Sequence, residues 1–198
     1  MDDCYSDQTF ALMNRRDKVK VLIIEDNNYK LEDAIRILQE FGINHYVHVN
    51  SYLEAVDICF RKERLSEFDF IILDIQFYLY RHIPGSHFMP DAHAGYKFLY
   101  QLASHGSTKP VFVFSSVKDY LKEYEEFLFP SFSEYNRQFN SQTSIFILAS
   151  ARYAKYEEEK KKNEQILANS NFVIGHAHNR YELKNLVTSY LNSNNQNG

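Results

Sequence analysis

The chain of 198 residues contains only two cysteines, Cys4 and Cys59, which lie far apart and lack the close spacing of metal ligands. Two distant cysteines fit reduced thiols in a cytoplasm and not a disulfide framework. Basic residues are not in excess either, because 22 lysines and arginines face 26 aspartates and glutamates, for a formal net charge of −4. The sequence therefore offers no electrostatic support for a nucleic-acid partner.

Long apolar runs are also missing. No segment approaches the roughly 18 consecutive apolar residues that a membrane span requires. The N-terminal stretch MDDCYSDQTF is acidic and polar, without the basic start and apolar core of a signal peptide. Hydrophobic residues make up 44% and charged residues 24%, which is typical of a globular domain. We therefore expect a cytoplasmic domain that contacts neither membrane nor nucleic acid directly.

Short aliphatic runs of strand length recur between polar segments. Several are apolar without interruption, which favours parallel strands that are covered on both faces over a sheet with one wet face. The six runs are VKVLIIE (19–25), HYVHV (45–49), FDFIILDI (68–75), PVFVFSS (110–116), SIFILAS (144–150) and NFVIGH (171–176).

Helical patterns lie between these runs. The clearest is a stripe of apolar residues at the helical period that ends before Gly42. Ser51 and Glu54 have the spacing of a capping box, and the last helix carries a second apolar stripe. Alternating strands and helices predict an α/β fold with a doubly wound parallel sheet, whose site lies at the carboxyl ends of the strands. The two stripes are Leu31, Ala34, Ile35, Leu38 and Phe41, and Leu183, Leu186, Val187 and Leu191.

No internal repeat or linker divides the chain, so we predict a single domain over 18–191. Residues 1–17 and 192–198 are expected to be flexible ends.

Acidic residues follow two of the predicted strands. Glu25 and Asp26 end the first run, Asp74 ends the third, and Ser115 follows the fourth. Two like charges ~4 Å apart repel by roughly 4 kcal/mol at an effective dielectric constant of about 20. A divalent cation removes this repulsion, and a site of oxygen ligands with open positions suits Mg²⁺. A nearby hydroxyl can hold a phosphoryl oxygen.

These stretches resemble the receiver domain of two-component response regulators. VLIIEDN looks like the first receiver strand with its acidic pair, and FDFIILDI looks like the third strand with its phosphoacceptor aspartate. AGYKFLYQLASHGSTKPVFVFSS is similar to the third helix, the next loop and the fourth strand, and RYELKNLV to the closing helix. The resemblance implies a five-stranded, flavodoxin-like receiver fold.

The resemblance also implies roles for particular residues. Mg²⁺ would be bound by Asp26, Asp74 and the backbone carbonyl of Gln76, with Glu25 assisting through water. Asp74 would accept a phosphoryl group from a histidine kinase, and Ser115 would contact that group. Physically, this is a carboxylate nucleophile beside a cation that neutralises charge on the transferred group.

One position departs from the family pattern. Receivers have a lysine at the end of the last strand that pairs with the phosphoryl group. Counting back from Leu183 puts His176 at this position, and a shift of one residue would put Gly175 there. Neither residue supplies a permanent cation, because histidine is mostly neutral near pH 7.

Two segments are longer than a receiver requires. Residues 77–92 form an inserted loop, which we expect to lie over the acidic site. His82 and His87 in this loop and His93 just after it do not have the spacing of a zinc site. Residues 117–169 read as an inserted strand and helix unit, so that 110–116 and 144–150 compete to be the fourth receiver strand. We predict the former, because the glycine-led helix precedes it at the right distance.

Three functions are compatible with these residues. The first is a phosphorelay receiver module with Asp74 as phosphoacceptor, whose partners are a histidine kinase or phosphotransfer protein and a downstream protein; a homodimer is left open. The alternative is a degenerate receiver that acts as a phosphorylation-independent scaffold. The third is a Mg²⁺ nuclease or phosphohydrolase. Such a protein would require a second acid two residues after Asp74, where this sequence has Gln76. We expect no enzymatic activity beyond Mg²⁺-dependent self-phosphorylation.

Overall fold

The computed structural model describes residues 18–79, 91, 93–117, 161–162, 164–165, 168 and 172–196. The inserted unit predicted within 117–169 and the run 144–150 lie almost wholly outside these residues, as do 1–17 and most of the loop 77–92.

Five parallel strands and four α-helices make up the described part of the chain. None of the described helices has the length and apolar character needed to cross a membrane. The elements are β1 (Lys20–Ile24), α2 (Asn28–Glu40), β2 (His45–Val49), α3 (Tyr52–Val56), the π-helix η1 (Asp57–Arg61), the 3-10 helix η2 (Arg64–Glu67), β3 (Phe70–Leu73), α4 (Ala94–Ser104), β4 (Val111–Phe114), β5 (Val173–Ala177) and α8 (Arg180–Gln196).

The strands form one sheet in the order β2-β1-β3-β4-β5. This is the flavodoxin-like, doubly wound order, so the predicted fold class is confirmed. Residues 110–116 were predicted as the fourth receiver strand, and β4 lies within them, paired with β3 on one side and with β5 on the other.

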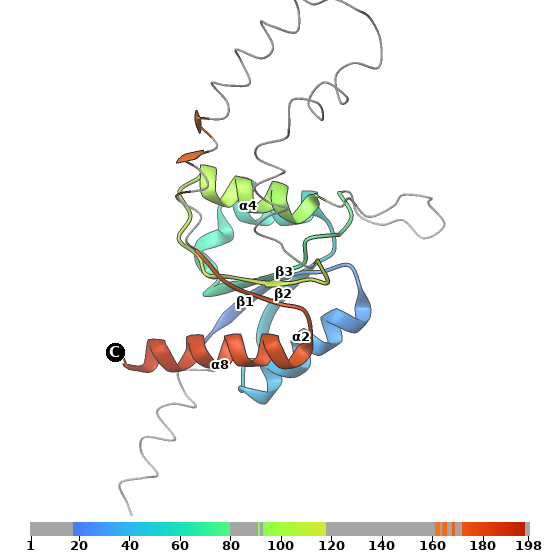
Figure 1. The fold of residues 1–198 in the computed structure, drawn as a ribbon, viewed down its shortest axis with the longest axis vertical. Coiled ribbons are helices and arrows are strands. Elements are labelled where there is room, and N and C mark those ends of the chain that lie inside the picture. Colours follow the sequence, from blue (N-terminus) through green and yellow to red (C-terminus); the bar gives the residue numbers. More distant parts are fainter. Residues whose placement is uncertain are drawn as a thin grey trace, which may run out of the picture.

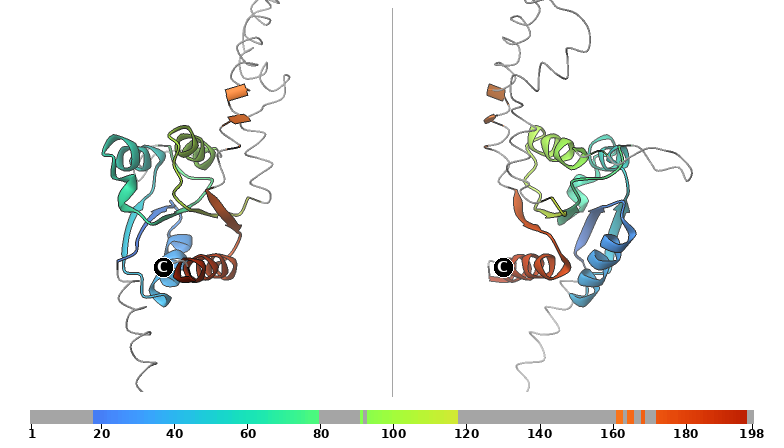
Figure 2. Two further views of the ribbon diagram at one scale, coloured as in Figure 1. Left: turned by 90° about the vertical axis from the view of Figure 1, so that its left-hand side faces the viewer. Right: turned by 45° about the vertical axis from the view of Figure 1, so that its right-hand side comes forward.

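Helices cover both faces of the sheet. In Figure 1, α4 lies above the sheet, and α2 and α8 lie below it; the views in Figure 2 show the same two layers. Strand side chains alternate between the layers, because successive residues of a strand point to opposite faces. Leu22 and Ile24 of β1 belong to the core under α3 and α4, whereas Val21 and Ile23 belong to the core over α2 and α8. Burial on both faces explains the uninterrupted apolar runs.

The first helix, α2, is capped at its start and ends before Gly42, as its sequence predicts. The side chain of Asn27 accepts hydrogen bonds from the backbone N–H groups of Tyr29 and Lys30, at 2.9 and 3.3 Å, and so caps the N-terminus of α2. At the other end Gly42 has φ +72°, a left-handed conformation that glycine adopts without strain. The cap matters for the site because it holds the first turn of α2 against the end of β1.

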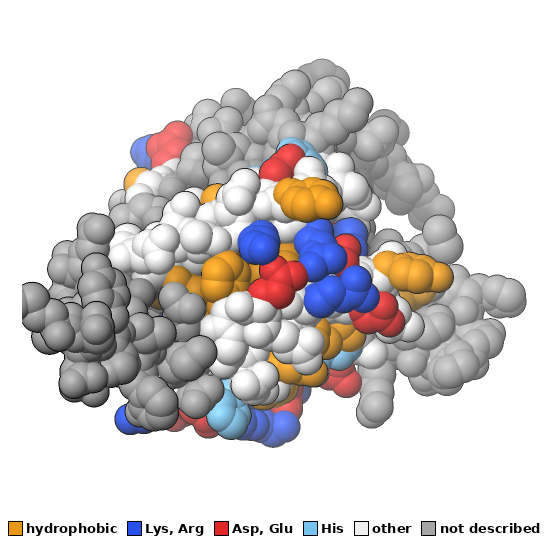
Figure 3. All heavy atoms as spheres, turned by 90° about the horizontal axis from the view of Figure 1, so that it is seen from below, with side chains coloured by type: hydrophobic (Ala, Val, Ile, Leu, Met, Phe, Trp, Pro, Cys, Tyr) orange, Lys and Arg blue, Asp and Glu red, His pale blue; other side chains and the backbone are white. Residues whose placement is uncertain are grey.

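The last helix packs beside α2. Glu40 of α2 forms ion pairs with Arg180 at 2.6 Å and with Lys184 at 2.7 Å. Figure 3 shows acidic and basic side chains interspersed on this side of the molecule. The helix α8 continues through Gln196, past the expected end of the domain at 191. No proline or glycine interrupts 192–196, so the helix propagates past its apolar stripe.

The first turn of α4 packs directly on the backbone that follows β3. The Gly95 N–H donates to the carbonyl oxygen of Ile75 at 2.8 Å. A Cβ atom at Gly95 would lie 2.5 Å from Ile75 Cα and 2.6 Å from the carbonyl oxygen of Asp74. Only glycine therefore lets this helix approach the segment that carries Asp74.

This contact predicts that Gly95→Ala destabilises the protein by about 1–3 kcal/mol, because the new methyl group must displace backbone atoms. Helix propensity alone would favour alanine over glycine by about 1 kcal/mol, so the sign of the effect distinguishes the two influences. Urea denaturation measures the free energy of unfolding.

The matched control is Ser104→Ala, an exposed position at the end of the same helix, which should change the free energy of unfolding by no more than about 0.5 kcal/mol. A Gly95→Ala protein as stable as the wild type would contradict the close packing of α4 on residues 74–75.

Candidate functional site

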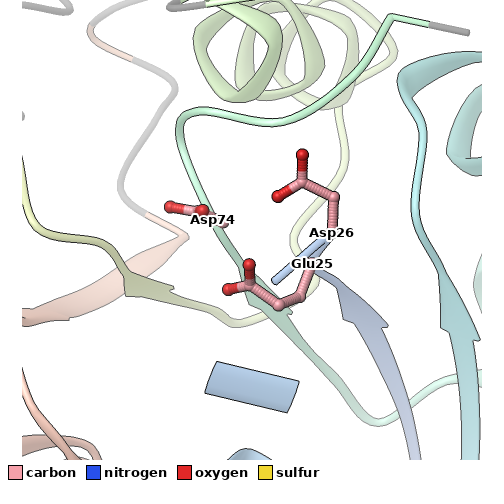
Figure 4. A group of neighbouring side chains, drawn as sticks. All are labelled: Glu25, Asp26 and Asp74. Atoms are coloured by element: carbon pink, nitrogen blue, oxygen red, sulfur yellow. The ribbon is translucent and has the colours of Figure 1, made fainter. Parts of the chain in front are cut away.

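Three carboxylates meet at the carboxyl edge of the sheet. Glu25 and Asp26 directly follow β1, and Asp74 directly follows β3, which pairs with β1 in parallel register. One side-chain oxygen from each of the three lies within 4.8 Å of the others. Figure 4 shows the three side chains projecting from the two neighbouring strand ends into the same region. The predicted convergence of these residues is thus observed, while their role stays a prediction.

Backbone hydrogen bonds hold the acids in place. The Glu25 N–H donates to the carbonyl oxygen of Val49 at 3.1 Å, and the Asp74 N–H donates to that of Ile24 at 2.9 Å. Each side chain is also tied by one oxygen: Oε1 of Glu25 accepts from the Asn27 N–H at 2.9 Å, and Oδ1 of Asp74 accepts from the Ile75 N–H at 2.7 Å. Neither of these two hydrogen bonds uses the second oxygen, Glu25 Oε2 or Asp74 Oδ2.

A lysine reaches into this cluster from the first turn of α2. Lys30 Nζ lies 2.9 Å from Asp74 Oδ2 and 4.0 Å from Glu25 Oε2. Reasoning from the sequence missed this residue, because Lys30 and Asp74 are 44 positions apart. A signal was available: Lys30 is a cation in the first turn of a helix, where the helix dipole disfavours positive charge.

Burial of the acids perturbs their proton affinity. Desolvation is the main cause that raises the pKa of Glu25 well above its usual value, and the charge of Asp74 adds to it, while Lys30 opposes both. Desolvation, again with the charge of Asp74, raises the pKa of Asp26 to about 6. Without a cation, Glu25 and Asp26 therefore retain protons at a pH where exposed carboxylates have lost theirs.

The donor set suits a hard divalent cation. All three side chains offer oxygen, and Glu25 Oε2 is buried with no hydrogen-bond partner among the described residues. An orphaned buried oxygen costs free energy unless something binds it. Mg²⁺ prefers such oxygen ligands and keeps several waters, which fits a site at the edge of a sheet.

The hydroxyl predicted to contact a phosphoryl group lies at the end of β4. Ser115 is buried, and its Oγ also has no hydrogen-bond partner among the described residues. Its backbone N–H donates to the carbonyl oxygen of Ala177 at 3.1 Å, which continues the ladder between β4 and β5. Gln76, predicted to offer its carbonyl oxygen, is exposed in the bend after Asp74.

The residue at the family's lysine position contacts the same strand end. His176 donates from Nε2 to the carbonyl oxygen of Ser115 at 3.0 Å, and its ring lies 4.1 Å from that of His178. The alternative position, Gly175, faces α8: a Cβ atom there would lie 2.7 Å from a methyl group of Leu186. The side chain of His176 is therefore the one that reaches the end of β4, and its predicted role stays a prediction.

The beginning and end of the inserted loop are tied to the domain. Phe77 is fully buried and forms an isolated antiparallel bridge with Asp91, and Tyr78 forms a parallel bridge with Ser51. Asp91 in turn pairs with Lys97 of α4 at 2.8 Å. A hydrogen bond from the Tyr78 backbone also favours the charged form of Asp26. The described start of the loop therefore lies beside the acidic cluster; residues 80–90 and 92 lie outside the described residues, so the prediction that the loop covers the site stays a prediction.

The chain matches no protein-family model and no curated protein. Solved structures with a similar fold include a two-component response regulator from Legionella pneumophila, with 19% identity, a TM-score of 0.43, and coverage of 89% of this chain and 99% of that one. The phosphorylated cyanobacterial phytochrome response regulator RcpA has 17% identity and a TM-score of 0.45, with coverage of 87% and 90%.

A third similar structure is the receiver domain of the histidine kinase CKI1 from Arabidopsis thaliana, complexed with Mg²⁺ and BeF₃⁻. The two sequences are 20% identical, and the TM-score is 0.38. The match covers 59% of this chain and 78% of the CKI1 receiver. All three are receivers or response regulators, the family that the sequence resembles. At these identities and scores the likeness is one of fold and says nothing about the chemistry of the site.

The buried acids predict an unusual pH dependence for the metal-free protein. Above about pH 5 the unfolded chain releases the proton that folded Glu25 keeps, so the free energy of unfolding should fall as pH rises toward the raised pKa of Glu25. Asp26 adds to this fall between its ordinary pKa of 3.8 and about 6. Glu25→Gln should flatten the slope, as measured by urea denaturation with EDTA from about pH 5 to about pH 8.

Glu67→Gln is the control, because hydrogen bonds from Arg64 and Lys20 lower the pKa of Glu67 to about 2. This residue is ionised in both folded and unfolded chains above about pH 5, so its removal should leave the slope in place. A wild-type protein whose stability rises over the same range would refute the assignment of a protonated, buried Glu25.

Proposed function

We propose that this chain is a phosphorelay receiver module of the cytoplasm that binds Mg²⁺ at Glu25, Asp26 and Asp74 and accepts a phosphoryl group on Asp74. The observation that carries this proposal is the convergence of three carboxylates within 4.8 Å at the carboxyl edge of a flavodoxin-like sheet. Such sheets bind ligands at this edge, where the strand order reverses.

In this proposal each residue has a part in the transfer. Oδ1 of Asp74 is held by the Ile75 N–H, so Oδ2, which pairs with Lys30, is the proposed nucleophile. As Oδ2 forms a bond to phosphorus, the P–N bond to the donor histidine breaks and its electron pair stays on the imidazole nitrogen. A bound Mg²⁺ would neutralise charge on the transferred group.

Two further residues would contact the phosphoryl group or the metal ion. The unpartnered, buried Oγ of Ser115 at the end of β4 can donate a hydrogen bond to a phosphoryl oxygen, which would relieve its own unsatisfied state. The carbonyl of Gln76, two residues after Asp74, is the remaining candidate ligand for Mg²⁺. The donor would be a histidine kinase or phosphotransfer protein, and the signal would pass on through a downstream protein partner.

The second candidate is a scaffold that binds partners without phosphorylation. The observation that favours it is the ion pair between Lys30 and Asp74, which neutralises the phosphoacceptor position without a metal and occupies Oδ2. The presence of histidine instead of lysine at position 176 also favours the scaffold. In this case the acidic cluster would have no part in phosphoryl transfer.

Titration with Mg²⁺ and then beryllofluoride separates the two functions, with backbone amide shifts as the measurement. We expect the wild type to respond to both in the millimolar range or below. Asp74→Asn should weaken Mg²⁺ binding at least about tenfold and abolish the beryllofluoride response, because it removes a charged ligand and the nucleophile.

Asp57→Asn is the matched control, since Asp57 forms its ion pair with Lys62 away from the acidic cluster. This variant should respond as the wild type does. No wild-type response to either Mg²⁺ or beryllofluoride at millimolar concentrations would rule out the receiver function and leave the scaffold.

A further inference from the structure

We propose that Lys30 supplies the positive charge that pairs with a phosphoryl group on Asp74, in place of the lysine that receivers carry on their last strand. In the unphosphorylated protein the same ammonium group neutralises Asp74 and so would oppose the binding of Mg²⁺ at the acidic cluster. This inference rests on the proposed function of Asp74, and it assigns Lys30 a role as a phosphoryl-contact residue.

The position of Lys30 is that of a built site and not of a chance surface pair. Its side chain is 27% exposed, and both carboxylates that it approaches are only 3% exposed. By contrast, the ion pair of Lys62 with Asp57 joins side chains that are 57% and 35% exposed. Ion pairs strengthen as solvent is excluded, so the contact of Lys30 with Asp74 is the stronger constraint of the two.

The backbone of Lys30 is held in relation to the acids. Asn27 caps α2 and accepts a hydrogen bond from the Lys30 N–H, while the Asn27 N–H donates to Glu25 Oε1. A cation in the first turn opposes the helix dipole, so helix formation gives no reason for lysine at this position. The reason lies instead in the carboxylates that its ammonium group reaches.

The contact is made to the oxygen that matters for transfer. Lys30 Nζ donates to Oδ2 of Asp74, whereas Oδ1 is taken by the Ile75 N–H. Within the described residues, no other lysine or arginine forms an ion pair with any of the three acids of the cluster. A group placed on Oδ2 would therefore lie beside this ammonium, and the flexible four-carbon side chain of lysine can move aside and pair with its oxygens.

The test compares four proteins: wild type, Lys30→Met, Lys30→Arg and Lys62→Met. Methionine keeps an unbranched side chain and a similar helix propensity while removing the charge. Mg²⁺ affinity is measured from backbone amide shifts, and beryllofluoride affinity by fluorine NMR at saturating Mg²⁺. The amide spectra also report whether each variant is folded.

The expected result is a pair of opposite effects. Lys30→Met should bind Mg²⁺ about tenfold more tightly than the wild type, because no ammonium competes for Asp74, and should bind beryllofluoride about tenfold more weakly. Lys30→Arg should keep most of the beryllofluoride affinity, since it preserves the charge. Lys62→Met should match the wild type in both measurements.

The outcomes separate this inference from the proposed function. If the wild type takes up no beryllofluoride at saturating Mg²⁺, the proposed function fails and the role of Lys30 fails with it. If the wild type binds both ligands and Lys30→Met binds beryllofluoride equally well, only the role of Lys30 is overturned. Weaker binding of both ligands by Lys30→Met would mark a structural role and would overturn it too.

Discussion

Electrostatic repulsion among Glu25, Asp26 and Asp74 is the constraint around which the carboxyl edge of this domain is organised. Parallel pairing of β1 with β3 brings the acids to adjacent strand ends, with ligand oxygens within 4.8 Å of each other. At that separation and an effective dielectric constant of about 20, each pair of full charges would repel by roughly 3 kcal/mol. Burial removes the water that would otherwise screen them.

The metal-free protein relieves this repulsion in three ways. Backbone N–H groups of Asn27 and Ile75 hold one oxygen of Glu25 and one of Asp74. Burial and the charge of Asp74 raise the pKa of Glu25, so that its proton is retained. Lys30 adds a full positive charge. None of these satisfies Glu25 Oε2, which remains without a hydrogen-bond partner among the described residues and so leaves a reason for a cation to bind.

The position of the cation sets this site apart from the pattern that the sequence resembles. There, a lysine reaches the phosphoryl group from the last strand; here, His176 at that position donates to the carbonyl oxygen of Ser115 instead. The positive charge beside Asp74 comes from Lys30 of α2, which follows β1. In the sheet, β1 and β5 lie on opposite sides of β3, the strand that precedes Asp74. Because Asn27 caps α2 and its N–H donates a hydrogen bond to Glu25, one short segment holds both Lys30 and Glu25.

Local pattern was enough to predict the described strands, the helix that ends before Gly42 and the acids that follow β1 and β3. Side-chain period and strand ends depend on neighbours in the chain. Local pattern also selected 110–116 as the fourth strand. The contacts of Lys30 with Asp74 and of His176 with Ser115 join residues 44 and 61 positions apart, and no local rule sets those distances. Only the tertiary structure decided these contacts. The packing of α2 on the sheet and the pairing of β5 with β4 determine which side chains reach the strand ends. The sequence by itself determined that an acidic site would form. The tertiary structure decided that Lys30 is the side chain that pairs with Asp74 there.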